Sequence, residues 1–339
     1  MLAGLTANEQ YYRRTISSIG VSMLSLWLFM NTVGSLLLVV EDAIAGLVLS
    51  FVWADIIYQL FYGLFYFLAF TLPVIVLRVM IGRSGDVYHS TKTDLRLSGY
   101  LPVIVLGGIF LIFVQSTLNA ALVSIFDYAA FSEQVIWGVE DLRGYGVVLK
   151  FIVAALIPAF CEEFLFRGAV LSNLLPFGRT NAILISAVLF AVMHQNAEQV
   201  LYAFAAGILL GVVYERTGSI WNCVFLHLMN NFSSIVITIL SQKLHRNAEV
   251  GSTLAALLLF LVCGGAVALL VRYLSKKETR FEDGIFGKSF PATDSYATCK
   301  LAPGRSVSLF FAFPMVLFFL LAASQVITLI WRAVTYSYA

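Results

Sequence analysis

Charged side chains are scarce in this 339-residue chain and make up 12% of it, against about 25% in soluble globular proteins. Hydrophobic residues make up 60%, and the mean hydropathy is +0.90. The shortage of charge is not local, because apolar stretches long enough to cross a bilayer recur from Thr15 to Trp331. This composition excludes a soluble enzyme, a disordered chain and a nucleic-acid-binding domain. It indicates a polytopic integral membrane protein.

Cysteine is also rare, and no C-x-x-C pair is present among Cys161, Cys223, Cys263 and Cys299. Three of the four lie in or beside apolar segments, so neither a zinc site nor a disulfide framework is indicated. We therefore expect neither a metal nor another cofactor.

The apolar stretches predict an all-α bundle, since a spanning helix needs about 20 mainly apolar residues. Two of the stretches are short and fit tilted, re-entrant or broken helices, so the expected number of transmembrane helices is about eight or nine. A cleavable signal peptide is not expected, because the first stretch is too long. The spans are expected near 15–40, 56–80, 100–126, 145–165, 182–195, 200–214, 220–241, 253–273 and 308–331.

Basic residues predict the orientation of the bundle. Arg13 and Arg14 precede the first span, and the loops after the second and eighth spans are also basic, whereas the loops on the other side are acidic. Because basic loops stay in the cytoplasm, the N-terminus is expected there, and nine spans would place the C-terminus outside. The long polar segment 274–307 is expected to be a cytoplasmic loop.

Polar side chains accumulate inside the spans between Phe151 and Leu240. A charge deep in a bilayer costs roughly 2.5–3.5 kcal/mol on insertion scales, so it normally faces a cavity or a partner. A single intramembrane His or Asn is usually a contact between helices. A joint set from three helices is better explained as a site, and it consists of Glu162, Glu163, Arg167, His194, His227 and Asn231.

Helical spacing sorts these groups onto faces. Glu163 and Arg167 are four residues apart and can form an ion pair, which taken alone could be purely structural. Glu162 is rotated by about 100° from its neighbour, so the two carboxylates should have different tasks.

The other polar groups pair in the same way. His227 and Asn231 present an imidazole and an amide to one spot, and the ring of Phe190 should pack beside His194 and support it. A carboxylate beside an imidazole can deprotonate water, and a second imidazole with an amide can stabilise an oxyanion. This set points to hydrolysis of an amide bond without a covalent intermediate.

The same residues resemble the motifs of the CPBP family, the CAAX-prenyl-endopeptidase-like intramembrane proteases, also called the Abi family. The motifs are E-E-x-x-x-R, F-x-x-x-H and H-x-x-x-N, and the stretch GVVYERTGSIWNCVFLHLMNN is similar to the lead-in to the third. The resemblance covers 145–241 as a catalytic core, with transmembrane helices expected in 1–144 and 242–339 on either side.

The resemblance implies a bundle of about eight transmembrane helices with a conical cavity open to the cytoplasm, and glutamate-dependent, metal-free activation of water. It implies Glu162 as general base with His194 as its partner on the water. It further implies an oxyanion hole made by His227 and Asn231, with Glu163 and Arg167 orienting the site.

Other classes fit the sequence less well. A zinc protease would lack H-E-x-x-H, no rhomboid-like serine is found, and no pair of intramembrane aspartates is available. A proton- or ion-coupled transporter could use Glu and His groups, but no inverted repeat is seen and the polar groups form one cluster. A non-catalytic scaffold or a bacteriocin-immunity protein could keep the same fold.

The expected partners are the lipid bilayer and a peptide or protein substrate, with or without a lipid modification. The family name refers to prenylated C-termini, while other members are tied to peptide maturation and self-immunity. None of the residues above selects among these substrates.

Overall fold

The computed structural model describes residues 5–46, 51–86, 88, 108, 144–195, 197–244, 299, 301 and 304–337. Every regular element in this part of the chain is a helix, which confirms the all-α prediction. The spans predicted at 100–126 and 253–273, and most of the loop predicted at 274–307, lie outside the described residues.

The first two helices are long. α1 covers Ala7–Ala45 and α2 covers Phe51–Ser84. A capping box starts α1, in which the Thr6 side chain accepts from the Glu9 backbone and the Glu9 side chain accepts from the Thr6 backbone. This reciprocal pairing satisfies two of the free N–H groups at a helix start.

Within the described residues, two helices are long and apolar enough to cross a membrane, Ala7–Ile44 and Val52–Ser84. The expected number of eight or nine spans is therefore matched only in part. Three shorter apolar helices are present at Arg179–Met193, Gln199–Glu215 and Phe313–Gln325.

A third helical rod carries the two glutamates. Its segments run on without a break, and its two π-helical stretches flank the α-helical turn that holds Glu162 and Glu163. Pro158 lies just after the first π-helical stretch and cannot donate a backbone hydrogen bond. Short π-helical stretches within α-helices often mark functional sites. The segments are α4 (Gly144–Lys150), η3 (Phe151–Leu156), α5 (Ile157–Glu163), η4 (Phe164–Leu171), α6 (Ser172–Leu174) and η5 (Leu175–Phe177).

This rod extends beyond the end predicted near residue 165. The helix itself continues to Phe177, because the polar residues that follow residue 165 are satisfied inside the bundle. Arg167 and Asn173 are fully buried, and the Asn173 amide donates to the Ala169 carbonyl at 2.7 Å. The rod ends at Gly178, whose φ of 125° favours glycine.

Three further helices complete the part of the bundle around the glutamates. α7 covers Arg179–Met193, α8 covers Ala197–Thr217 and α9 covers Ile220–Leu244. The expected short helices are thus 15 and 21 residues long. Gln195 ends α7 in the left-handed conformation, with φ of 53°.

The span predicted at 308–331 is broken into two helices. α11 covers Arg305–Phe310 and α12 covers Phe313–Ser337. The break falls just before Pro314, a residue that fits the first turn of a helix but not its interior. α12 packs closely on α1, because a Cβ atom on Gly20 would lie 2.6 Å from the Met315 backbone nitrogen.

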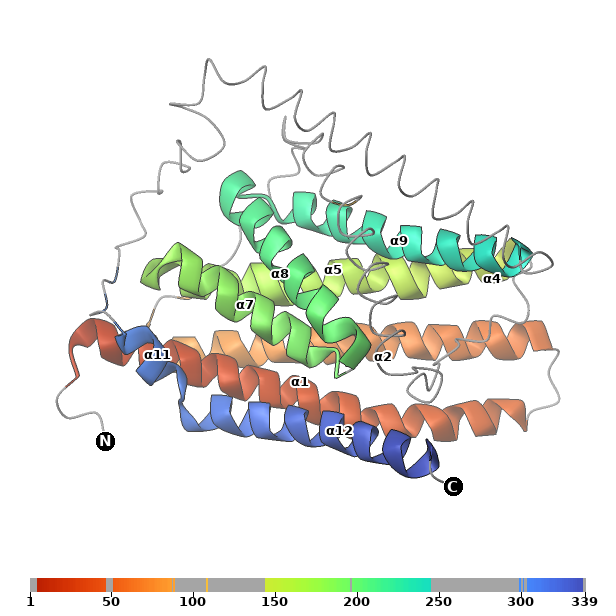
Figure 1. Cartoon of the computed structure of the whole chain (residues 1–339), viewed down its shortest axis with the longest axis horizontal. Coiled ribbons are helices and arrows are strands. Elements are labelled where there is room, and N and C mark those ends of the chain that lie inside the picture. Colours follow the sequence, from red (N-terminus) through yellow and green to blue (C-terminus); the bar gives the residue numbers. More distant parts are fainter. Residues whose placement is uncertain are drawn as a thin grey trace, which may run out of the picture.

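The helices form a bundle in which α1 packs between α2 and α12 (Figure 1). The segment α5 contacts both α2 and α9, and α7 packs along α8. The N- and C-termini lie at opposite ends of the bundle (Figure 1). The helix that carries the glutamates is therefore surrounded by helices from both sides of the sequence.

Candidate active site

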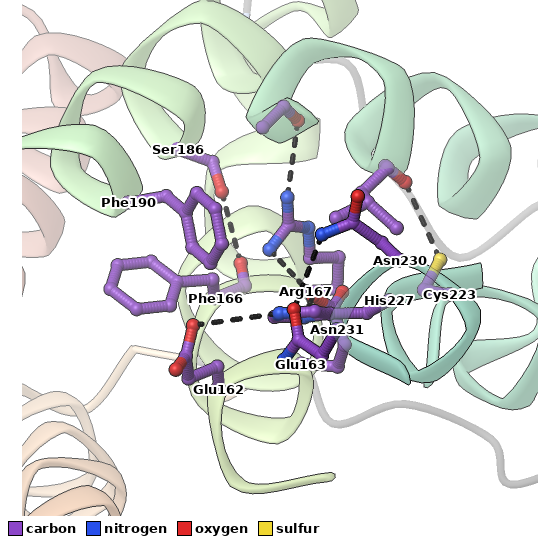
Figure 2. A network of polar contacts seen from close by, with 12 residues as sticks. Glu162, Glu163, Phe166, Arg167, Ser186, Phe190, Cys223, His227, Asn230 and Asn231 are labelled. Carbon is purple, nitrogen blue, oxygen red and sulfur yellow. Dashed lines mark hydrogen bonds and ion pairs between the residues drawn. The ribbon is translucent and has the colours of Figure 1, made fainter. Parts of the chain in front are cut away.

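Glu162 and Glu163 at the end of α5 are both buried, with exposed fractions of 3% and 0%. The Oε1 atom of Glu163 accepts hydrogen bonds from Arg167 Nη1 at 3.0 Å and from His227 Nδ1 at 2.8 Å. The predicted ion pair between Glu163 and Arg167 is thereby confirmed. Figure 2 shows this network at close range.

Arg167 has no exposed surface and is held from three sides. Besides Glu163, its Nη2 atom donates to the backbone carbonyl of Gly207 at 3.2 Å, and its guanidinium lies 4.6 Å from the centre of the Phe190 ring. A guanidinium over an aromatic face gains electrostatic stabilisation. Arg167 thus ties η4 to α7 and α8.

Glu162 has a different set of neighbours from Glu163, as the helical spacing predicts. Its Oε1 atom accepts a hydrogen bond from the hydroxyl of Tyr66 on α2. Its Oε2 atom is buried, has no hydrogen-bond partner among the described residues, and lies 4.0 Å from Nε2 of His227 (Figure 2). One oxygen of this carboxylate is therefore anchored by Tyr66, and the other faces the imidazole of His227.

His227 lies between the two carboxylates. An ionised carboxylate can only accept hydrogen bonds. Nδ1 of His227 therefore carries a proton and donates a hydrogen bond to Glu163. Its Nε2 atom then points toward Glu162. Sequence reasoning placed His227 with Asn231 but did not foresee this bridge between both glutamates.

His194 caps the C-terminal end of α7. Its Nδ1 atom lies 2.7 Å from the Phe190 carbonyl oxygen, which makes Nδ1 the donor and leaves Nε2 as the acceptor. The Phe190 and His194 rings meet edge to face at 5.0 Å, which confirms their predicted packing. Within the described residues, no direct hydrogen bond joins His194 to Glu162.

A small cavity of about 40 Å³ opens among α7, α8 and α9. A cavity needs about 10–15 Å³ on this measure to hold one water molecule, so water fits. Its lining contains three of the four predicted catalytic side chains; Glu162 is not one of the lining residues and lies 4.0 Å from His227, which is. The lining residues are Phe190, His194, Tyr202, Ala203, Ala206, Leu210, His227, Asn230 and Asn231.

The two asparagines beside the cavity form a pair. Asn230 donates through Nδ2 to Oδ1 of Asn231 at 3.2 Å. Because the carbonyl oxygen of Asn231 is engaged in this way, its Nδ2 group is the part that can donate to a bound molecule.

We also searched for metal ligands. In the part of the chain that the structure describes, no group of three or more His, Cys, Asp and Glu side chains is arranged to hold a metal ion. The polar side chains around Glu162 and Glu163 form hydrogen bonds with one another and with backbone carbonyls instead.

These features define a buried glutamate–histidine site in an all-helical bundle. Residues 144–233 match the family model of the Rce1-like proteins, type II CAAX prenyl endopeptidases. This match confirms the resemblance inferred from the motifs, over the segment that the family model covers.

A relative is found in Bacillus subtilis (strain 168), the protein named "Putative membrane peptidase YdiL". It is 33% identical to this chain over 94 residues, which are 27% of this chain and 38% of the relative. The match thus spans less than two fifths of that protein. No solved structure gives a significant match.

The matched segment contains all seven site residues that the motifs predicted, but not every residue that contacts them. Sequence reasoning missed Tyr66, which lies 96 residues before Glu162 in an otherwise apolar helix and carries no signal of its role. It also missed the carbonyl of Gly207 and the cavity-lining Tyr202. Asn230 lies in the same polar run as His227 and Asn231, but the motifs assign it no role.

Proposed function

We propose that this protein is a membrane-embedded endopeptidase that hydrolyses a peptide bond with water activated by Glu162. The observation that carries the proposal is the state of this carboxylate. It is buried, one oxygen is held by a phenol, and the other has no hydrogen-bond partner among the described residues and faces an imidazole next to a water-sized cavity. The match of residues 144–233 to the family model of CAAX prenyl endopeptidases supports the same activity.

The distribution of buried charged side chains and exposed apolar side chains supports a membrane location. Glu163 and Arg167 have no exposed surface, whereas Leu60, Leu64 and Phe313 are 65%, 56% and 76% exposed. Charges inside and large apolar groups outside are what a hydrocarbon solvent requires. We infer a multi-pass protein with eight or nine spans, an N-terminus in the cytoplasm and a cavity that opens on that side.

The first step is the addition of water to the scissile carbonyl. Glu162 Oε2 removes one proton from the water while His194 Nε2 accepts the hydrogen bond of the other. The water oxygen forms a bond to the carbonyl carbon, and the carbonyl electron pair moves onto its oxygen.

The developing oxyanion needs hydrogen-bond donors. Asn231 can supply an N–H, and His227 can supply Nε2–H when its ring carries both protons. Glu163 and Arg167 hold the imidazole in place.

The second step breaks the C–N bond. The electron pair of the oxyanion re-forms the carbonyl, the nitrogen leaves, and Glu162 returns its proton to that nitrogen. The products are a carboxylic acid and an amine, so one water is consumed per bond cleaved and the carboxylate is regenerated.

We propose residues 145–241 as the catalytic core, with 1–144 and 242–339 as flanking membrane segments. The substrate is then a peptide or protein that reaches the site from the bilayer or the cytoplasmic surface, and it can be prenylated or unmodified.

The test is cleavage of a panel of membrane-tethered peptides, prenylated and unprenylated, with the new termini identified by mass spectrometry. We expect the wild type to cleave at least one peptide, and Glu162→Ala and His194→Ala to abolish cleavage while the proteins still insert and fold. EDTA should leave the activity intact. Inactivation by EDTA with recovery on addition of zinc would contradict this mechanism.

A further inference from the structure

The α2 helix contributes a side chain to the candidate site. The Tyr66 hydroxyl donates a hydrogen bond to Oε1 of Glu162 across the contact between α2 and α5. Tyr66 lies outside residues 144–233, the segment that matches the endopeptidase family. The polar surroundings of Glu162 therefore extend into the N-terminal helices.

The phenol of Tyr66 is held by its neighbours along α2. Its ring stacks on Phe70 with centroids 4.8 Å apart, and it lies against Tyr62 at 6.0 Å. These residues are spaced four apart and share one face of the helix. Ring packing on both sides restricts the two side-chain torsions of Tyr66 and fixes the position of its hydroxyl.

A carboxylate held at one oxygen has a defined orientation. The terminal torsion of a free Glu side chain is broad, so the plane of its carboxylate is not fixed by the side chain itself. The bond from Tyr66 holds Oε1, and the other oxygen, Oε2, then lies 4.0 Å from Nε2 of His227. The hydroxyl therefore fixes the orientation of the Glu162 carboxylate toward the imidazole.

We propose that Tyr66 is a positioning residue that orients the Glu162 carboxylate for its role as base. The proposal rests on the function proposed above. It assigns part of the site to a helix that the family match does not cover, and it acts through Glu162 rather than on the substrate.

The test is Tyr66→Phe, which removes the hydroxyl and keeps the ring that packs on Phe70. We expect kcat to fall about 10- to 100-fold, the effect of losing one hydrogen bond to a charged group, while KM changes less than twofold. The matched control is Tyr12→Phe. Tyr12 is a buried tyrosine on α1 whose hydroxyl has no hydrogen-bond partner among the described residues, and its loss should leave kcat unchanged.

A second readout does not depend on activity. The infrared difference spectrum between the wild type and Glu162→Gln isolates the carboxylate bands of Glu162. We expect Tyr66→Phe to shift these bands and Tyr12→Phe to leave them in place. A general loss of packing would not move these bands selectively.

The outcomes separate the two proposals. Unshifted bands, or a wild-type kcat in Tyr66→Phe when Glu162→Gln is inactive, would overturn the role of Tyr66 and leave the endopeptidase proposal standing. Shifted bands in a protein that cleaves no peptide would support the orientation of Glu162 by Tyr66 and count against the proposed activity.

Discussion

Glu163 connects two other side chains of the buried polar network. Its Oε1 atom is shared by the Arg167 guanidinium and the His227 imidazole at 3.0 and 2.8 Å. These partners come from η4 and α9, so one carboxylate joins two helices and orients a proposed donor of the oxyanion hole.

Replacing Glu163 with Gln should therefore damage both stability and activity. Removal of one partner of a buried ion pair typically costs 3–5 kcal/mol, because the other charge is left uncompensated. We expect Glu163→Gln to lower the free energy of unfolding by about that amount, measured by denaturation in detergent. Cleavage should fall at least 100-fold, because a neutral amide replaces the charged acceptor that orients His227.

The exposed Glu41 on α1 supplies the control, and Glu41→Gln should alter neither property. The double variant Glu163→Gln with Arg167→Met should regain stability relative to the single one, since no unpaired charge remains. A Glu163→Gln variant as stable as the wild type would show that the Glu163 carboxylate does not stabilise this part of the bundle.

At this scale the sequence predicts contacts that follow from spacing along one helix. The Glu163–Arg167 pair and the Phe190–His194 packing are of this kind, because i and i+4 side chains meet whatever the tertiary structure. The bond from Tyr66 to Glu162 depends on how two distant helices dock, and tyrosine is an ordinary residue in an apolar helix.

At the scale of helices, the crossing of α7 and α8 determines where Arg167 finds its second partner. A Cβ atom on Gly207 would lie 2.8 Å from the backbone Cα of Ala187, so the two helices touch through their backbones. Small residues allow such close approach in membrane proteins. The same glycine offers its carbonyl to Arg167 at 3.2 Å.

Gly207→Ala should force α7 and α8 apart and displace that carbonyl. We expect a loss of roughly 1–3 kcal/mol, the usual cost of overpacking, together with reduced cleavage. The control is Gly82→Ala on α2, where an added Cβ would meet nothing within 4 Å. There we expect no loss of stability, measured as the melting temperature in detergent. Equal melting temperatures for the two variants would contradict the close crossing.

Helix positions could be predicted from hydropathy, but helix ends could not. Apolar runs identify where a spanning helix can form, whereas the rod of α4 to η5 continues past 165 because Arg167 and Asn173 are satisfied inside the bundle. Hydropathy counts such residues as polar and ends the helix too early. The π-helical stretches on either side of Glu162 likewise have no signature in the periodicity.

At the scale of the whole molecule, the two termini lie at opposite ends of the bundle (Figure 1). Arg305 Nε contacts Glu9 Oε1 at 2.6 Å, so α11 begins beside the start of α1, and α12 then packs along α1. Arg14 and Asp86 form another ion pair at this end, which joins α1 to the chain beyond α2.

The basic side chains near the start of α1 predict which side of the membrane this end of the bundle faces. Because Lys and Arg near the ends of spans favour the cytoplasm, we expect a reporter fused to the N-terminus to be active inside the cell. With nine spans, a reporter fused to the C-terminus should be active outside. Termini on the same side of the membrane would contradict the arrangement of α1 and α12.

Composition alone could predict a membrane-embedded helical bundle, and three motifs could predict most of the polar cluster. The sequence could not predict which side chains of the polar cluster line the cavity and which do not. His227 lies within 4.0 Å of both carboxylates and lines the cavity, whereas Glu162 does not line it. That division depends on the packing of α2, α5 and α9, which no single motif contains.

The central claim is that Glu162 is the base that activates water. The most direct test is the single-turnover rate of peptide cleavage by purified wild type and Glu162→Gln, with Glu41→Gln in parallel. Loss of a general base costs about 10²- to 10⁴-fold in rate, so we predict a fall of at least 100-fold for Glu162→Gln and none for Glu41→Gln. A Glu162→Gln rate within twofold of the wild type would contradict the account.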